Sequence, residues 1–390
     1  MSVSEQSAVD LRYMRLALRL AQRGQGFVEP NPMVGAVLVG NAAIIAQGWH
    51  QRFGGPHAEI NAINAAEVSP RGGTLYVTLE PCCHTGKTGP CTQAIIAAGL
   101  KRVVVAMRDP NALVCGRGIA QLRRAGIRVD VGVLESQARQ LNRPFIKWIT
   151  TRQPYVIAKW AQTLDGGIAD RYGKSQWISS PESRKRVHHI RGHVDGIMVA
   201  IGTALADDPM LTARPRKKTD IRRTATRIII DSHCRLPLNS RLVLTATNVP
   251  TLVFHRMSLT GAALLRMKKL TQHGVACIGV RADKNGNLDM AAVLTELGKR
   301  NFTNILVEGG PTLLGSMLKN ELIDEGLVFI APKIAGDQSA RHAVEGIVLQ
   351  SISKATMLEF AQPERIGPDI LLRWQVIAVR NKKSDESSAK

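Results

Sequence analysis

The chain has 390 residues, of which 44% are hydrophobic and 21% charged, and this balance excludes an intrinsically disordered protein. The length exceeds one ordinary hydrophobic core and therefore indicates two domains. The formal net charge of +21 is compatible with nucleic-acid binding, with phosphorylated small substrates or with a basic surface. The most basic stretch, residues 214–227, contains no aromatic side chain that could stack on bases, so we expect no specific nucleic-acid partner.

The first residues show no basic start followed by an apolar core, and no apolar run is long enough to cross a bilayer. We therefore expect a cytoplasmic protein that is not bound to a membrane. Three of the six cysteines, Cys82, Cys83 and Cys91, lie within ten residues of one another. In a chain without an export signal, such clustering indicates a metal site rather than a disulfide framework.

The N-terminal half alternates helical and strand patterns. We expect Asp10 to cap a helix with Met14 and Leu18 on its apolar face, and Gly24 to end that helix. The alternation predicts a three-layer α/β/α domain with a largely parallel sheet over residues 1–150. The predicted strands are 33–39, 74–80, 103–109 and 129–134, and the predicted helices follow His57 and cover 90–98, 118–125 and about 137–148.

A second α/β pattern begins at Pro154 and predicts a second domain over residues 151–380. The polar and charged residues 381–390 are expected to form a disordered tail. The predicted strands are 155–159, 196–200, 227–231, 251–255, 304–308 and 327–331, and the predicted helices are 181–194, 259–273, 290–300 and 311–322.

Three short motifs in the first half point to a hydrolytic zinc site. His57 lies two residues before Glu59, Cys82 follows a proline, and Cys91 lies in the first turn of a predicted helix. One imidazole and two thiolates leave a fourth position on zinc for water, whose pKa the metal lowers. A carboxylate two residues beyond the histidine ligand can carry protons between that water and a leaving ammonia. This order of residues is typical of zinc-dependent base deaminases.

Each motif alone has a simpler explanation, because His-Ala-Glu also occurs at the start of a surface helix. The combination, in this order and at the ends of elements, favours the zinc site. Eight residues separate Cys82 from Cys91, where the general signature has two. Cys83 is adjacent to Cys82 and is not expected to bind the same ion. We interpret Cys83, Cys115, Cys234 and Cys277 as small core residues.

In the second half, residues 304–316 (NILVEGGPTLLGS) predict a strand, a Gly-Gly turn and a helix that begins at Pro311. Amides at a helix start can bind a phosphate or pyrophosphate, although the same pattern often forms a plain connection. His188, His189 and His193 could suggest a metal site, but we interpret them as partly exposed helix residues.

The stretch between the two cysteines carries a resemblance to a known family. Residues 81–91, PCCHTGKTGPC, resemble the PCxHxGRTPPC motif of the RibD family, which joins a diaminohydroxyphosphoribosylaminopyrimidine deaminase to a 5-amino-6-(5-phosphoribosylamino)uracil reductase. The sequences NPMVG at 31–35, GPHAE at 55–59, ADDP at 206–209 and EGGPTL at 308–313 resemble further motifs of that family in the same order. The chain departs from the family at Lys87, Gly89, Ala36 and Ala112, none of which is an expected metal ligand.

The resemblance implies a cytidine-deaminase-like N-terminal domain and a C-terminal domain similar to dihydrofolate reductase, with Zn²⁺ and NADPH as cofactors. It implies that His57, Cys82 and Cys91 bind zinc and that Glu59 is the catalytic proton shuttle. Positions matching the family's substrate site are Ser175, Arg191, Leu211, Arg214 and Glu308. Positions matching its NADPH site are Ala161, Trp177, Thr203, Asp207, Ser232, Gly310, Pro311, Thr312, Leu313, Leu314, Gly315 and Ser316.

The implied activity is hydrolytic deamination of a phosphorylated pyrimidine, followed by NADPH-dependent reduction of its ribosyl group to ribityl. The expected partners are this small substrate and further copies of the chain in a homo-oligomer. Two alternatives stay open, namely a zinc deaminase that acts on RNA with a C-terminal half that only binds, and a zinc-stabilised binding protein without catalysis. Glu59 opposes the second, since a purely structural zinc site has no use for a carboxylate beside an open position.

Overall fold

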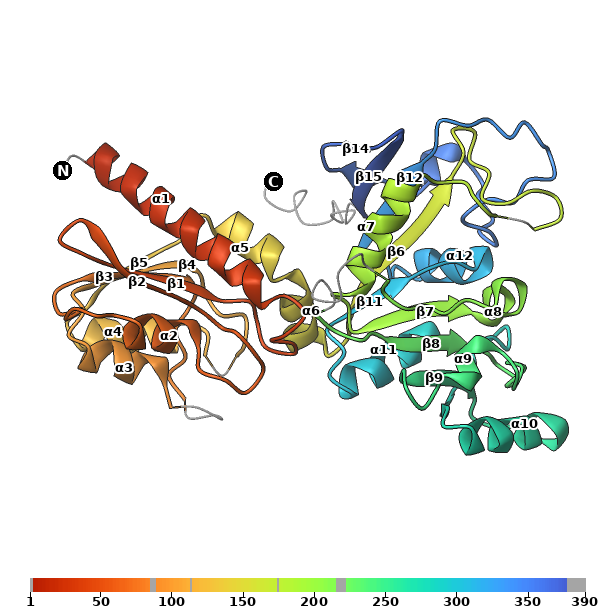
Figure 1. The fold of residues 1–390 in the computed structure, drawn as a ribbon, viewed down its shortest axis with the longest axis horizontal. Helices are drawn as coiled ribbons and strands as arrows, with labels where there is room; N and C mark the ends of the chain where they lie inside the picture. The colour runs from red at the N-terminus through yellow and green to blue at the C-terminus, as the bar shows by residue number, and fades with distance from the viewer. Residues whose placement is uncertain (1–2, 85–88, 113, 174, 215–221, 377–390) are drawn as a thin grey trace, which may run out of the picture. The chain divides into compact units, whose positions relative to one another are not determined.

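The computed structural model describes residues 3–84, 89–112, 114–173, 175–214 and 222–376, with side chains from Ser7 onwards. The chain divides into two compact units, Met1–Tyr155 with Thr295–Thr303, and Val156–Leu294 with Asn304–Lys390. Each unit has its own sheet (Figure 1). The predicted tail 381–390 and residues 215–221 of the basic stretch lie outside the described residues.

The first unit is built on a five-stranded sheet. Its strands lie in the order β2 (Ala43–Trp49), β1 (Gly35–Gly40), β3 (Thr74–Leu79), β4 (Arg102–Met107) and β5 (Arg128–Val131). Figure 1 shows α1 (Val3–Ala21) and α5 (Glu135–Leu141) on one face, and α2 (Ala58–Asn64), α3 (Cys91–Ala97) and α4 (Arg117–Arg124) on the other. The predicted three layers are confirmed.

The sheet is mixed, so the prediction of a largely parallel sheet is wrong. Strand β1 pairs antiparallel with both β2 and β3, whereas β3, β4 and β5 run parallel. Strand β2 was not predicted. It follows a tight turn in which Asn41 and Ala42 both have positive φ angles, 50° and 61°. Such turns normally carry glycine at the second position, so the Asn-Ala pair hides the hairpin in the sequence.

The single helix predicted over about 137–148 is two helices, α5 and α6 (Arg143–Thr151). Asn142 separates them, and its side-chain amide forms both hydrogen bonds with the backbone of Met33, accepting from the N–H at 2.8 Å and donating to the carbonyl at 2.9 Å. Pro144 lies in the first turn of α6, where its missing N–H costs nothing. A contact with a residue 109 positions away therefore sets the break.

Asp10 does not cap a helix, because it lies inside α1, which begins at Val3. Its carboxylate is buried and accepts hydrogen bonds from Arg102 at 2.8 and 2.7 Å and from the Tyr76 hydroxyl at 2.8 Å. Arg102 also donates to Asp130 at 2.7 Å. Burial and the Asp10 carboxylate raise the pKa of Tyr76 above its ordinary value. This network ties the first helix to strands β3, β4 and β5.

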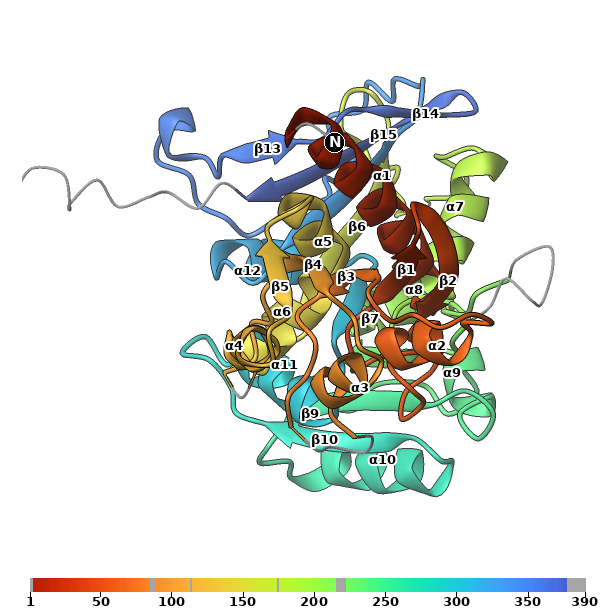
Figure 2. The same cartoon turned by 90° about the vertical axis from the view of Figure 1, so that its left-hand side faces the viewer.

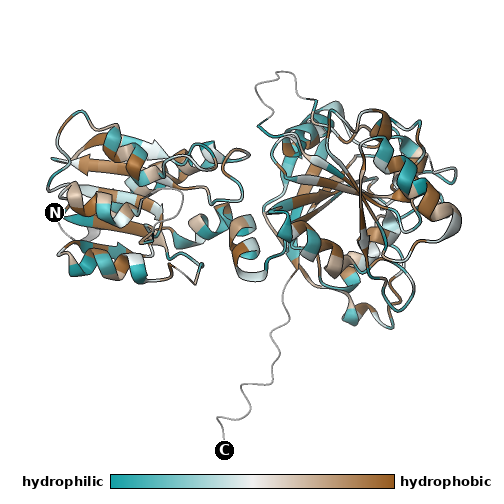
Figure 3. Cartoon of the chain, turned by 90° about the horizontal axis from the view of Figure 1, so that it is seen from below, coloured by the Kyte–Doolittle hydropathy of each residue, from teal (hydrophilic) through white to brown (hydrophobic). Residues whose placement is uncertain are grey.

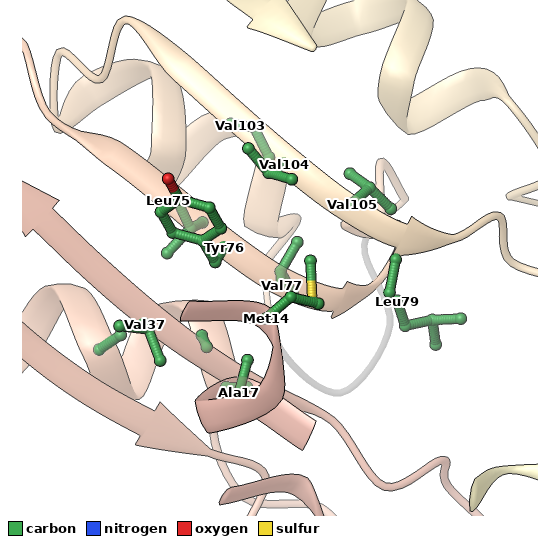
Figure 4. Close-up of a cluster of buried hydrophobic side chains, with 14 of the residues drawn as sticks. Met14, Ala17, Val37, Leu75, Tyr76, Val77, Leu79, Val103, Val104 and Val105 are labelled. Atoms are coloured by element: carbon green, nitrogen blue, oxygen red, sulfur yellow. The ribbon is translucent and has the colours of Figure 1, made fainter. Parts of the chain in front are cut away.

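The core of the first unit lies between α1 and the sheet and continues on the sheet's other face. Figure 4 shows Met14 and Ala17 of α1 beside side chains of β1, β3 and β4. The strands are buried along most of their length, as expected for strands covered on both faces. The labelled core residues are Met14, Ala17, Val37, Leu75, Tyr76, Val77, Leu79, Val103, Val104 and Val105.

The second unit is built on a ten-stranded sheet in the described part of the chain. Along it lie β10 (Ala276–Val280), β9 (Thr251–Arg256), β8 (Thr226–Ile230), β7 (Gly196–Ala200), β11 (Asn304–Val307), β6 (Tyr155–Gln162), β12 (Glu325–Ile330), β15 (Asp369–Val376) and β13 (Leu358–Phe360), and β14 (Glu364–Ile366) pairs with β15. Strands β7 to β10 are parallel, as are β11 with β7 and β12 with β6, whereas β13, β14 and β12 are antiparallel to β15.

All the strands and helices predicted for this unit are present. The helices are α7 (Pro181–Arg191), α8 (Ile201–Asp207), α9 (Arg241–Leu244), α10 (Gly261–Gln272), α11 (Met290–Lys299) and α12 (Pro311–Lys319). Two of them, α8 and α9, were not predicted, nor were β10 and the C-terminal strands. Figure 2 shows β13, β14 and β15 together, and two of these strands have three residues each, too few to produce a pattern.

Hydropathy is distributed as this architecture requires. Figure 3 shows largely hydrophobic strands in both sheets and helices that carry hydrophilic and hydrophobic residues on different faces. Among the described helices, none is both long and apolar enough to cross a membrane.

The Asp10 network generates the first prediction. The substitution Asp10→Ala should lower the free energy of unfolding of the first unit by about 2–4 kcal/mol, because it leaves buried donors of Arg102 and Tyr76 without their acceptor. Denaturant titration of the full chain, with hydrogen exchange in β3 and β4 reporting on the first unit, measures the loss.

The matched control is Glu135→Ala, which removes the exposed pair that Glu135 forms with Arg139 at 2.7 Å. This change should cost no more than about 0.5 kcal/mol. Equal losses for the two variants would show that the Asp10 network does not hold the first unit together.

Candidate functional site

The structure brings His57, Cys82 and Cys91 together in the first unit. Nδ1 of His57 lies 3.3 Å from Sγ of Cys91 and 3.5 Å from Sγ of Cys82, and the Cys91 amide donates to Sγ of Cys82 at 3.4 Å. All three ligand atoms lie within 4.8 Å of one another. Corners of a tetrahedron at zinc bond lengths lie about 3.5–3.8 Å apart, so this set of donors fits a zinc ion.

The ligands come from the ends of three elements. His57 is the residue before α2, Cys82 follows β3, and Cys91 is the first residue of α3. The amide of Cys91, at the start of α3, donates to Sγ of Cys82 and so favours the thiolate form of that cysteine. Hydrogen bonds from the Cys91 thiol, from His57 and from the Cys91 amide lower the pKa of Cys82 to about 4, although burial opposes this shift. A thiolate is the form that binds metal.

Glu59 lies on the first turn of α2 and is 3% exposed. Burial raises the pKa of its carboxyl to about 7, against the opposing charge of His57. Cys91 also lies within hydrogen-bonding contact of this carboxyl. A carboxyl group that can gain and lose a proton near neutral pH, beside the three ligands, suits proton transfer.

These four residues open onto a cavity of about 310 Å³ within the first unit. Asn31 and His50 line it and contact each other, with Asn31 Nδ2 3.1 Å from His50 Nε2. The other ring nitrogen of His50 lies 3.0 Å from the Pro56 carbonyl. Since the amide donates to Nε2, the ring carries its proton on Nδ1, and burial, the largest effect, lowers the pKa of His50. The neutral ring therefore holds Asn31 in place.

Two further cavity residues, Asp109 and Asn111, follow β4 and were missed by the sequence analysis. The Asp109 carboxylate accepts a hydrogen bond from the Asn111 amide at 2.8 Å, and burial raises the pKa of Asp109 to about 6. The buried carboxylate of Glu80 fixes this loop by accepting from the amides of Asp109 at 3.2 Å and Gly116 at 2.9 Å. The sequence feature that could have indicated Asp109 and Asn111 is their position directly after a buried strand.

The remaining cysteines and the histidine group differ in part from expectation. Cys234 is buried as predicted, and Cys83 and Cys277 are half-buried, but Cys115 is exposed because it lies in the turn before α4. His193, which follows α7, is buried rather than partly exposed, and the centre of its ring lies 4.3 Å from that of the tilted ring of His189. Within the described ranges, His57, Cys82 and Cys91 are the one group of three or more suitable side chains that could hold a metal ion.

The second unit holds a larger cavity, of about 1360 Å³, at the carboxyl ends of its parallel strands. It collects most positions that the family resemblance assigned to NADPH and substrate, but Leu314 and Gly315 face the protein interior instead. The assigned positions that line it are Ala161, Ser175, Trp177, Arg191, Thr203, Asp207, Leu211, Arg214, Ser232, Glu308, Gly310, Pro311, Thr312, Leu313 and Ser316.

The predicted strand, Gly-Gly turn and helix are confirmed at β11 and α12. Gly309 and Gly310 have φ angles of 96° and 92°, and a Cβ on Gly310 would lie 2.8 Å from Cβ of Ala200. Only glycine therefore fits this turn. The start of α12 faces the same cavity, so its free amides form a cradle that fits a pyrophosphate.

Arg191 and Glu308 form a two-pronged ion pair on the cavity wall, with Nε to Oε1 at 2.7 Å. Although burial raises the pKa of Glu308, the Arg191 guanidinium and the Lys159 ammonium lower it to about 2. The guanidinium of Arg191 is thus committed to Glu308 through two of its nitrogens, which leaves it less available to a substrate phosphate. Lys159, a half-buried lysine of β6 beside this pair, was missed because a lone lysine in a strand has no distinctive pattern.

Trp177 is not a core residue, since 62% of its side chain is exposed. The guanidinium of Arg184 lies 4.4 Å from the centre of its ring. The exposed indole, at the edge of the cavity, is available to a ligand rather than to the interior.

Both halves of the chain match known families. Residues 7–107 match the cytidine and deoxycytidylate deaminase zinc-binding region, and residues 154–372 match the RibD C-terminal domain. The chain is 41% identical over 366 residues to the riboflavin biosynthesis protein RibD of Aquifex aeolicus, covering 93% of this chain and 98% of the relative. It is 39% identical over 375 residues to RibD of Escherichia coli strain K12, covering 93% and 98%.

Solved structures agree. The chain is similar to a diaminohydroxyphosphoribosylaminopyrimidine deaminase/5-amino-6-(5-phosphoribosylamino)uracil reductase from Thermotoga maritima, with a TM-score of 0.83, 34% identity and coverage of 95% of this chain and 100% of that one. It is also similar to Acinetobacter baumannii RibD, with a TM-score of 0.82, 32% identity and the same coverage. The predicted fold class of both halves is confirmed.

The first site generates a prediction on metal content. The full chain should bind about one zinc ion, and Cys82→Ser or Cys91→Ser should abolish binding, because each removes one of the three protein ligands. Elemental analysis of purified protein gives the zinc content. The matched control is Cys83→Ser, which changes the adjacent thiol and should leave the metal in place. Zinc lost from Cys83→Ser but kept in Cys91→Ser would refute the ligand assignment.

Proposed function

The chain belongs to the RibD family of bifunctional riboflavin biosynthesis enzymes, and we propose that its two cavities carry out consecutive reactions on one substrate. The first cavity deaminates 2,5-diamino-6-(5-phosphoribosylamino)pyrimidin-4(3H)-one to 5-amino-6-(5-phosphoribosylamino)uracil. The second reduces the ribosyl group of that product to ribityl. The observation that carries the proposal is a buried carboxyl, Glu59, beside three convergent zinc ligands.

In the deaminase half, His57, Cys82 and Cys91 would hold a zinc ion, which would act as a Lewis acid and make water nucleophilic at neutral pH. Glu59 takes a proton from the attacking water and passes it to the departing amino group, which leaves as ammonia. Asn31, oriented by the neutral ring of His50, offers its amide to the polar edge of the pyrimidine. The cavity of about 310 Å³ accommodates one heterocycle.

In the reductase half, NADPH supplies the hydride, and the protein binds and orients the reactants. The Gly309–Gly310 turn and the start of α12 take the cofactor's phosphates. The ion pair of Arg191 with Glu308 forms a rigid polar wall for the sugar, and the half-buried side chain of Lys159, which also lines the cavity, can donate a hydrogen bond to a ribose oxygen. The substrate would accept that hydride at C1′ of its ring-opened imine form, and the imine nitrogen would take up a proton from solvent to give the ribitylamine.

We assign the deaminase domain to residues 1–150 and the reductase domain to residues 151–380. The matched regions 7–107 and 154–372 fall within these limits and support the assignment. The alternative of an RNA deaminase with a binding-only second half is less well supported, because it gives the glycine turn and the large second cavity no role.

A homo-oligomer is supported by apolar side chains that face solvent near the C-terminal strands. Val348 is 92% exposed, Ile352 85%, Met357 62% and Phe360 57%. Exposed apolar groups concentrated in one segment are typical of a subunit interface. Sedimentation of the full chain as a monomer at micromolar concentration would contradict this assignment.

A cytoplasmic location is supported by cysteine chemistry. All six cysteines lie in the described part of the chain and none of them forms a disulfide there. Two of them are needed as thiolates for zinc. Reducing compartments preserve such thiolates. Recovery of the enzyme from a secreted or periplasmic fraction of the producing cell would overturn the location.

The function is tested by incubating the full chain with the diaminopyrimidine ribotide, with and without NADPH, and identifying products by mass. Without NADPH the uracil product should accumulate together with ammonia, and with NADPH the ribityl product should appear. An RNA deaminase would leave the ribotide unchanged.

The substitution Glu59→Gln separates the two reactions. It should lower deamination by at least about 100-fold, since a general acid–base contributes about 10²–10⁴-fold. Reduction of the already deaminated substrate should be unchanged, because the second cavity lies within the other unit. The matched control, Glu67→Gln, changes an exposed carboxylate outside the cavity and should retain both activities. Loss of both reactions in a folded, zinc-loaded Glu59→Gln protein would refute independent sites.

A further inference from the structure

The positions assigned to NADPH follow the carboxyl ends of the strands in spatial order. Ala161 lies near the end of β6, Gly310 follows β11, Thr203 follows β7 and Ser232 follows β8. These strands are neighbours in the sheet, so the assigned positions trace a path along one edge (Figure 1). The strand after β8 in that direction is β9, which ends at Arg256. The path therefore leads to Arg256.

The direction of the cofactor along this path follows from the substrate side. Arg191 and Glu308 lie near β6 and β11, together with Lys159 on β6. Hydride transfer requires the nicotinamide to lie beside the substrate. The adenosine end of the cofactor must then point the other way, toward β8 and β9.

Arg256 touches the assigned cofactor residue directly, since its backbone amide donates to the Ser232 carbonyl at 3.2 Å. Its half-buried side chain lines the cavity, and one terminal nitrogen donates to the Gly286 carbonyl, which fixes the direction of the guanidinium. Nε of Arg256 is buried without a hydrogen-bond partner among the described residues. The guanidinium of Arg256 is thus fixed in position and still has an N–H group that can donate a hydrogen bond to a ligand.

The other arginines at this end of the cavity differ in availability. Arg241 is committed to Asp208, whose carboxylate it contacts at 3.3 Å and whose carbonyl it also binds. Arg235 is 55% exposed and lies 3.9 Å from Asp231, beyond hydrogen-bonding distance. Arg235 and Arg256 therefore offer the cationic donors next to Ser232.

We propose that Arg256, assisted by Arg235, binds the 2′-phosphate of NADPH and thereby gives the reductase its preference for NADPH over NADH. This inference rests on the proposed NADPH-dependent reduction. Guanidinium groups bind phosphate through paired charge-assisted hydrogen bonds, and an arginine near the ribose is a recurrent means of accepting the extra phosphate. NADH presents a hydroxyl there, which leaves the two cations without an anion.

The test uses calorimetry on the full chain with two matched pairs of ligands, NADPH with NADH, and adenosine 2′,5′-bisphosphate with adenosine 5′-monophosphate. The substitution Arg256→Gln should weaken binding of NADPH and of the bisphosphate by about 10- to 100-fold, as expected for a lost charge-assisted hydrogen bond. Binding of NADH and of the monophosphate should change by less than about twofold. Arg235→Gln should show the same pattern with a smaller loss.

The matched control is Arg281→Gln, which removes an arginine near Gly286 that is paired with Asp289 at 2.6 Å and does not line the cavity. It should change neither ligand pair. Equal weakening of all four ligands by Arg256→Gln would mean that Arg256 only supports the loop around Gly286, and would overturn the proposal. Should Arg256→Gln fail to fold, Arg256→Lys keeps the charge without the fork, and it should weaken only the two ligands that carry the 2′-phosphate.

The outcomes also separate this inference from the function on which it rests. Wild-type protein that binds neither NADPH nor the bisphosphate would remove the reductase assignment itself. Wild-type protein that prefers NADPH, with the preference fully kept in Arg256→Gln and Arg235→Gln, would remove only the assignment of the 2′-phosphate site.

Discussion

Parallel strands that end at one edge of a sheet are the constraint on which both sites depend. Chain segments leaving neighbouring strands are delivered to the same place, and residues far apart in sequence can then converge there. In the first unit this brings Cys82, after β3, and Asp109, after β4, to one cavity. In the second unit it delivers Glu308, Ser232 and, beyond them, Arg256 to another. The chemistry differs between the two units, but in both of them neighbouring parallel strands bring the site residues together.

Buried charge shows how each site differs from the surrounding scaffold. Arg227 is fully buried, yet in the described structure its guanidinium is satisfied by carbonyls of Leu242 and Val249 and by the hydroxyl of Thr251. Burial lowers the pKa of Arg227 to about 10, so it stays protonated at neutral pH and acts as a structural brace. Around Glu308, by contrast, two cations share one carboxylate. This leaves net positive charge in the cavity, which favours an anionic ligand.

The sequence could predict whatever depends on local pattern. Buried strands and the glycine turn before Pro311 were predicted because side-chain periodicity and backbone freedom are visible within a few residues. The features that the sequence analysis missed depend on contacts between residues far apart in the sequence. Asp10 looks like a cap until Arg102 is placed beside it, and the helix break at Asn142 needs the backbone of Met33. The zinc ligands were predicted because each belongs to a short sequence motif. The roles of Asp109 and Lys159, in contrast, depend on the residues that surround them in the fold.

The high positive charge follows in part from the second cavity. Seven arginines line it, and within the described structure Arg191 pairs with Glu308, Arg241 with Asp208 and, at a longer distance of 3.9 Å, Arg235 with Asp231. Two phosphorylated ligands must share this one cavity during reduction, and each brings anionic oxygens that need donors. Arginines without a carboxylate partner at this edge of the sheet attract such ligands. Their positive charge also reduces the electrostatic repulsion between the two anionic ligands when both are bound. We propose that part of the excess of arginine binds small phosphorylated molecules at this edge of the sheet.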